Sequence, residues 1–147
     1  MKTWMSKNEL RNVPIGVLFL ASFYVFGAFI ILTWVFIDPT AVSRTIARAH
    51  GFLPVMGTGI VLVVAALALT LAYGLVRLSR WGFILTVTYS LYICLVNLVI
   101  SGLAFTWTVQ PQKQIFFGNF LFSAFVILYL LIERKHFFGV QPGGDRR

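Results

Sequence analysis

Four long apolar runs constrain this chain more than any other feature. They lie at about 13–37, 52–76, 81–107 and 115–132, and each approaches or exceeds the ~20 residues that a helix needs to cross a bilayer. Water is absent from the hydrocarbon core, so the backbone polar groups of each run must bond within the run as an α-helix. The sequence therefore predicts an all-α fold, a four-transmembrane-helix bundle.

The composition supports a membrane protein. Hydrophobic residues make up 59% of the chain and charged residues only 11%, whereas soluble domains hold about 45–50% apolar residues. A soluble chain of 147 residues could not hide so much apolar surface from water. We expect one membrane domain over residues 1–136 and a mobile cytoplasmic tail over 137–147, where Pro142, Gly143 and Gly144 disfavour regular structure.

The basic residues predict the orientation. Nine of the twelve Lys and Arg residues flank one side of the four runs, in the N-terminal segment, the turn at 77–80 and the C-terminal segment. Because Lys and Arg concentrate in cytoplasmic loops, both termini are predicted to be cytoplasmic, in a bacterial-type inner membrane or a thylakoid membrane. These positions account for the net charge of +8, so we expect no nucleic-acid partner. The side chains expected to contact lipid headgroups are Arg44, Arg48, Arg77, Arg80, Arg134 and Lys135.

A short interfacial helix is predicted in the loop between the first two spans. Asp38 can cap its start, Pro39 suits its first position and Gly51 can end it. Its apolar face would lie in the headgroup layer, with its two arginines pointing elsewhere. The segment is either a partner-docking or gating element, or a connector that faces lipid. The apolar face comprises Val42, Ile46 and Ala49.

The third span carries a polar stripe. Its members follow one another at intervals of four, four, three and four residues, which places them on one helix face. Asn97 must find a hydrogen-bond partner there, because an unpaired amide in hydrocarbon is costly. The stripe either lines a small polar cavity or holds helices together. It comprises Thr86, Ser90, Cys94, Asn97 and Ser101.

The other spans carry faces of different character. Small residues every four positions predict a close-packing face on the second span, made of Ala66, Thr70 and Gly74. The first and fourth spans carry aromatic faces that could meet lipid, a partner protein or a hydrophobic pigment. These faces comprise Phe19, Phe23, Phe26, Phe122, Phe125 and Tyr129.

No constellation of catalytic or metal-binding residues emerges. His50 and His136 are predicted at opposite ends of the bundle, so they could not share one metal ion. Asp38 and Glu133 are also on opposite sides and cannot act as an acid–base pair. We therefore expect a protein that is not an enzyme and that holds no metal or cofactor.

Two short stretches resemble a known group of proteins. The opening Arg11-Asn12-Val13-Pro14-Ile15-Gly16-Val17 resembles the R-P-x-G-V start of small uncharacterised four-helix membrane proteins of bacteria and archaea. Ala72-Tyr73-Gly74-Leu75 with Arg77, Arg80 and Trp81 is similar to their A-x-G-L-W-x-x-R-x-W turn. Val76 stands where that group has Trp, and Asn12-Val13 displace the proline. The resemblance implies the four-span topology and no particular activity.

Three hypotheses for function remain open. The first is an accessory or assembly subunit of a larger membrane complex, or a homo-oligomer, whose partners are the bilayer and another membrane protein or a second copy. The second is a small transporter or channel with a polar path along the third span. The third is a protein that binds lipid or pigment through its aromatic faces.

Overall fold

The computed structural model describes residues 13–51, 57–103 and 111–138, apart from the side chains of 101–103 and 111–116. Within these ranges the regular structure is entirely helical, as predicted. Four helices are long and apolar enough to cross a membrane, and a fifth, shorter helix follows the first. The helices are α2 (Ile15–Ile37), α3 (Pro39–Ala49), α4 (Gly59–Val76), α5 (Arg80–Leu103) and α6 (Pro111–Phe138).

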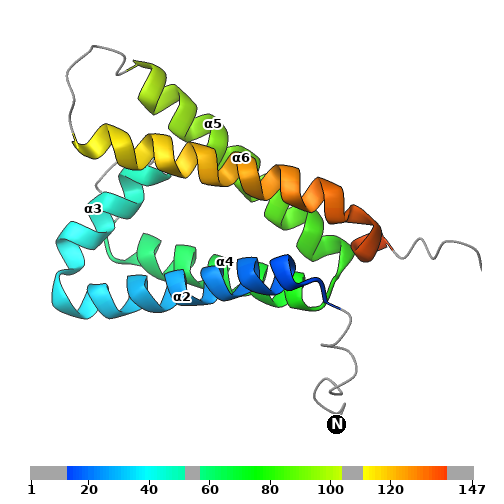
Figure 1. Cartoon of the computed structure of the whole chain (residues 1–147). Helices are drawn as coiled ribbons and strands as arrows, with labels where there is room; N and C mark the ends of the chain where they lie inside the picture. The colour runs from blue at the N-terminus through cyan, green and yellow to red at the C-terminus, as the bar shows by residue number, and fades with distance from the viewer. Residues whose placement is uncertain (1–12, 52–56, 104–110, 139–147) are drawn as a thin grey trace, which may run out of the picture.

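The four long helices form two pairs. Helix α2 packs along α4, and α5 packs along α6. The pairs meet where α4 turns into α5 and diverge toward the other end, where α3 lies between them (Figure 1). The start of α2 and the end of α6 lie beside the α4–α5 turn. We call this end of the bundle the turn end, and the opposite one the α3 end.

The core at the turn end joins all four long helices. Leu20 from α2, Leu75 from α4, Phe83 from α5 and Leu130 from α6 belong to one buried cluster. Phe137 is buried in the same cluster, and its ring lies 5.3 Å from that of Phe83. This contact explains why α6 continues through Phe138, past the predicted domain boundary at 136. The rest of the predicted tail, 139–147, lies outside the described residues.

The α4–α5 turn brings two glycine backbones together. A Cβ atom built on Gly74 would lie 2.6 Å from the Gly82 Cα, and one built on Gly82 would collide with the Gly74 backbone. The Ser79 hydroxyl donates to the Gly74 carbonyl at 3.0 Å and accepts from the Gly82 N–H at 3.1 Å. Leu78 takes a φ of 47° to complete the turn. The two helices therefore start in backbone contact and separate from there.

The predicted close-packing face of the second span is wrong for two of its three residues. Gly74 is buried, but Ala66 and Thr70 are exposed. The buried face of α4 instead contains Val61, Ala65, Leu71, Ala72 and Leu75. Thr70 tolerates its exposed position because its hydroxyl donates to the Ala66 carbonyl at 2.8 Å, within its own helix.

Candidate functional site

Helix α3 forms where the sequence predicts it, but its apolar residues Val42 and Ile46 pack against Ile60, Val61 and Val64 of α4 and do not face the headgroup layer. The Asp38 carboxylate accepts from the Ala41 N–H at 3.0 Å and from the Thr40 hydroxyl at 2.9 Å. The bond from the Ala41 N–H, followed by that from Thr40, lowers the pKa of Asp38. Gly51 ends the segment with a φ of 71°. The buried face of α3 differs slightly from the predicted one, because Val42 and Ile46 are buried with Ser43 and Ala47, whereas Ala49 is only half-buried.

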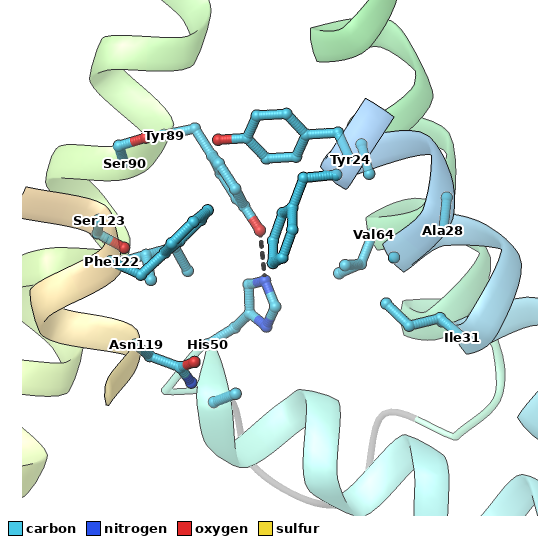
Figure 2. A pocket seen from close by; sticks show the side chains of 15 residues that line it. Tyr24, Ala28, Ile31, His50, Val64, Tyr89, Ser90, Asn119, Phe122 and Ser123 are labelled. Atoms are coloured by element: carbon cyan, nitrogen blue, oxygen red, sulfur yellow. Dashed lines mark hydrogen bonds between the residues drawn. The ribbon is translucent and has the colours of Figure 1, made fainter. Parts of the chain in front are cut away.

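His50, directly after α3, points into the gap between the two helix pairs (Figure 2). Its Nδ1 lies 2.9 Å from the Ile46 carbonyl, and its Nε2 lies 2.8 Å from the Tyr89 hydroxyl. A carbonyl only accepts, so Nδ1 carries the proton and Nε2 accepts from Tyr89. Burial lowers the pKa of His50 below its ordinary value of 6.5, and the bond to Ile46 opposes this shift in part. The ring is therefore neutral at pH 7.

Two further hydrogen bonds fasten the end of α3 to α5. The Tyr92 hydroxyl donates to the His50 carbonyl at 2.7 Å. The Asn97 amide donates to the Ala49 carbonyl at 3.4 Å and to the Ile93 carbonyl of its own helix at 2.8 Å. Helix α3 follows directly from α2, so these bonds tie the first helix pair to the second where the pairs are farthest apart.

A cavity of about 250 Å³ lies between the pairs, and all five described helices contribute to its wall. Ala28, Val64 and Ala68 are among its apolar residues. We call it the central cavity. Phe23 lines it and is also half exposed on the bilayer side of α2, so the cavity reaches the lipid-facing surface there. Its polar residues are Tyr24, His50, Tyr89, Ser90, Asn119 and Ser123 (Figure 2).

A second hollow of about 560 Å³ lies between α4 and α5, next to His50 at the end of α3. We call it the lateral groove. Val63 and Tyr92 line it and are exposed on the surface that would face lipid, so the groove opens toward the bilayer. His50, Val64 and Tyr89 line both the groove and the central cavity. These three side chains therefore form the wall between the two spaces.

The polar stripe of the third span points inward but does not form a continuous polar path. Thr86, Ser90 and Asn97 are buried, and Cys94 is half-buried. Ser90 lines the central cavity, whereas Thr86 donates to the Gly82 carbonyl at 2.7 Å and Asn97 bonds to two carbonyls. Ser90 thus faces the cavity, Asn97 links α5 to the end of α3, and the Thr86 hydrogen bond stays within α5. The side chain of Ser101 lies outside the described part.

The predicted aromatic faces are largely exposed, but some of their residues contact the neighbouring helix. Phe19, Phe26 and Phe125 are exposed. The rings of Phe23 and Phe122 lie 4.6 Å apart, across the α2–α6 boundary beside the central cavity. At the turn end, Tyr129 touches Gly16. Two contacts between α2 and α6 thus involve the predicted aromatic faces, one beside the central cavity and one at the turn end.

The predicted headgroup side chains divide between the two ends of the bundle. Arg44 and Arg48 lie on the exposed side of α3. The others are exposed at the turn end, where the Arg77 guanidinium lies 5.0 Å from the centre of the Tyr73 ring and Arg80 lies 6.0 Å from that of Phe138. The turn-end residues are Arg77, Arg80, Arg134 and Lys135.

The central residues of the site are not predicted from the sequence. The sequence places His50 at the opposite end of the bundle from His136 without a role of its own, and it does not single out Tyr24, Tyr89 or Asn119. A usable signal existed, since tyrosines within apolar spans need partners for their hydroxyls. Which partner each would find depends on how the helix pairs diverge, and that is not visible in one sequence.

Comparisons with known proteins do not identify the chain. No protein-family model matches it, and neither a curated protein nor a solved structure matches it. The relationship to small four-helix membrane proteins stays a prediction.

Proposed function

We propose that this integral membrane protein binds a lipophilic molecule, which it takes from the bilayer into the central cavity. The observation that carries the proposal is the cavity itself, an apolar space between five helices with a few converging polar groups. Apolar pockets of this kind are the usual form of small-molecule sites. The openings beside Phe23 and between α4 and α5 face lipid, so a ligand could enter sideways without crossing water.

A binding role fits the polar groups better than a catalytic one. Both ring nitrogens of His50 are engaged, one with a backbone carbonyl and one with Tyr89. A general base needs a nitrogen within reach of the proton it removes. His50 is therefore better suited to shaping the cavity wall than to transferring protons. We propose that the protein is not an enzyme.

Assembly with another membrane protein, or with a second copy, is the second candidate function. The exposed phenyl rings of Phe19 and Phe26 on α2 favour it. The same rings suit lipid chains equally well, and for this reason ligand binding takes first place. A channel along the third span has less support, because Thr86 and Asn97 use their polar groups on backbone carbonyls.

Filling the central cavity tests the proposal. Ala68 lines the cavity, whereas Leu62 of the same helix is exposed and lines neither the cavity nor the groove. We expect wild-type protein, purified in mild detergent, to yield a lipophile on organic extraction at about one molecule per chain. The series Ala68→Val, Ala68→Leu and Ala68→Trp should lose it progressively, and Leu62→Trp should retain it.

Thermal unfolding of each variant in the same detergent provides the folding control. The proposal is wrong if the folded wild type yields no more lipophile than an unrelated membrane protein. It is equally wrong if a folded Ala68→Trp variant keeps the full amount.

A further inference from the structure

Four of the six polar residues that line the central cavity lie on α5 or α6. Asn119 and Ser123 lie four residues apart on α6 and therefore share one face of that helix. Ser90 of α5 lines the same cavity (Figure 2). The opposite wall, from α2 and α4, includes Ala28, Ile31 and Val64. A ligand with one polar end would therefore place that end toward α6.

The polar groups of this cavity are not equally available to a ligand. Tyr89 donates its hydroxyl hydrogen to His50, and both nitrogens of His50 are occupied. The Tyr24 hydroxyl points toward Ser90 (Figure 2). The Asn119 side chain lines the same cavity as His50 and is half-buried. An amide offers two donors and one acceptor oxygen, so it can pair with either a hydroxyl or a carbonyl group.

Formal charge is missing from both spaces. Among the described residues, no Asp, Glu, Lys or Arg lines the central cavity or the lateral groove. A charged headgroup drawn into the cavity would lose its hydration without gaining a counter-charge, which is strongly unfavourable. A neutral hydroxyl or carbonyl loses far less on the same transfer, and one amide can satisfy it.

From these observations we infer that the ligand is an uncharged lipophile with a hydroxyl or carbonyl head, and that Asn119 binds this head. The inference rests on the proposed function and narrows it. Neutral lipids with one polar end, such as long-chain alcohols, belong to the class, whereas phospholipids, fatty-acid anions and cationic amphiphiles do not. The lateral groove is apolar and opens to the bilayer. It offers room for more of the ligand's hydrocarbon chain if the wall formed by His50 and Tyr89 moves.

Three probes with the same hydrocarbon chain test the inference. Delipidated protein is titrated with radiolabelled oleyl alcohol, with oleate at about pH 9 and with oleylamine at about pH 6.5, so that the acid and the amine are ionised. Oleyl alcohol is measured at both pH values. We expect saturable binding of the alcohol, at least about tenfold tighter than that of either charged probe.

The variant Asn119→Leu should weaken binding of the alcohol about fivefold, the effect of losing one hydrogen bond. Leu121→Ala, on the exposed side of the same helix, should leave it unchanged. Equal or tighter binding of oleate or oleylamine overturns the inference, and so does unchanged affinity in a folded Asn119→Leu variant.

The two proposals can fail separately. If a charged probe binds best and Ala68→Trp abolishes its binding, the cavity is a ligand site but the inferred head chemistry is wrong. If no probe binds and the wild type also releases no lipophile on extraction, both proposals are wrong.

Discussion

The environment of a single side chain decides what His50 can do. In the sequence it is a histidine between an amphipathic segment and a glycine. In the structure it is buried, and its ring reaches Tyr89 across the gap between the helix pairs. Because burial lowers its pKa, the folded protein holds it neutral at a pH where a solvent-exposed histidine would already bind a proton.

This shift predicts that stability falls in mild acid. The pKa of His50 is lower in the folded than in the unfolded state, so the unfolded state binds the extra proton first. The contribution of neutral His50 to the free energy of unfolding is complete above about pH 6.5. It is lost as the pH falls below that value, until His50 in the folded protein also becomes protonated. We expect His50→Gln, which cannot titrate, to show a smaller fall in melting temperature between pH 7.5 and 5 than the wild type.

The comparison variant for this measurement is His136→Gln. His136 lies at the turn end, 3.1 Å from Glu133 and away from the cavity. The variant His136→Gln should leave the part of the acid sensitivity that comes from His50 in place. An equal fall in the wild type and in His50→Gln would show that His50 does not titrate as its burial implies.

At the scale of helices, the divergence of the two pairs creates the site. Gly74 and Gly82 hold α4 and α5 in backbone contact at the turn end. At the α3 end the bonds to Tyr89, Tyr92 and Asn97 hold the end of α3 against α5. The cavity occupies the space between these two attachments. Its shape therefore depends on the glycine contact as well as on the residues that line it.

A methyl group at Gly82 should disturb this arrangement. In Gly82→Ala the new Cβ would meet the Gly74 backbone, which cannot move aside as a flexible side chain could. We expect a loss of about 1–3 kcal/mol in stability, the usual cost of overpacking. Gly118→Ala is the matched control, since nothing lies within 4 Å of its added Cβ. That variant should be neutral or more stable by up to about 1 kcal/mol, as alanine favours helices. Equal unfolding temperatures for both variants would contradict the close contact.

At the scale of the whole molecule, the sequence predicts the existence of the four spans and of the short helix well and the site poorly. The ends of the spans are less well predicted, since α4 begins at Gly59 and α6 extends from Pro111 to Phe138. The spans are predictable because lipid leaves an apolar run no alternative to a helix. The cap at Asp38 is equally local. Which helix face turns inward is harder to predict, because the core and the bilayer are both apolar and accept the same side chains. Ala65 is buried and its neighbour Ala66 is exposed, although nothing in their chemistry separates them.

The basic side chains lie at the two ends of the bundle, and the orientation in the membrane stays a prediction. In the described part of the chain, Arg77, Arg80, Arg134 and Lys135 are exposed at the turn end, and Arg44 and Arg48 are exposed at the α3 end. With the turn end in the cytoplasm, as Lys and Arg counting predicts, the lateral groove would open in the far half of the bilayer, because Gly59 and Val63 line it near the start of α4.

Native mass spectrometry of the protein released from its own membranes tests the central claim most directly. If the cavity between the helix pairs binds a lipophile, the wild-type spectrum will show the 16.6 kDa chain with one added neutral mass per chain that survives removal of the detergent. Ala68→Trp will show the bare chain under the same conditions. A wild-type spectrum that contains only the bare chain, recorded while the protein is still folded, would contradict the account.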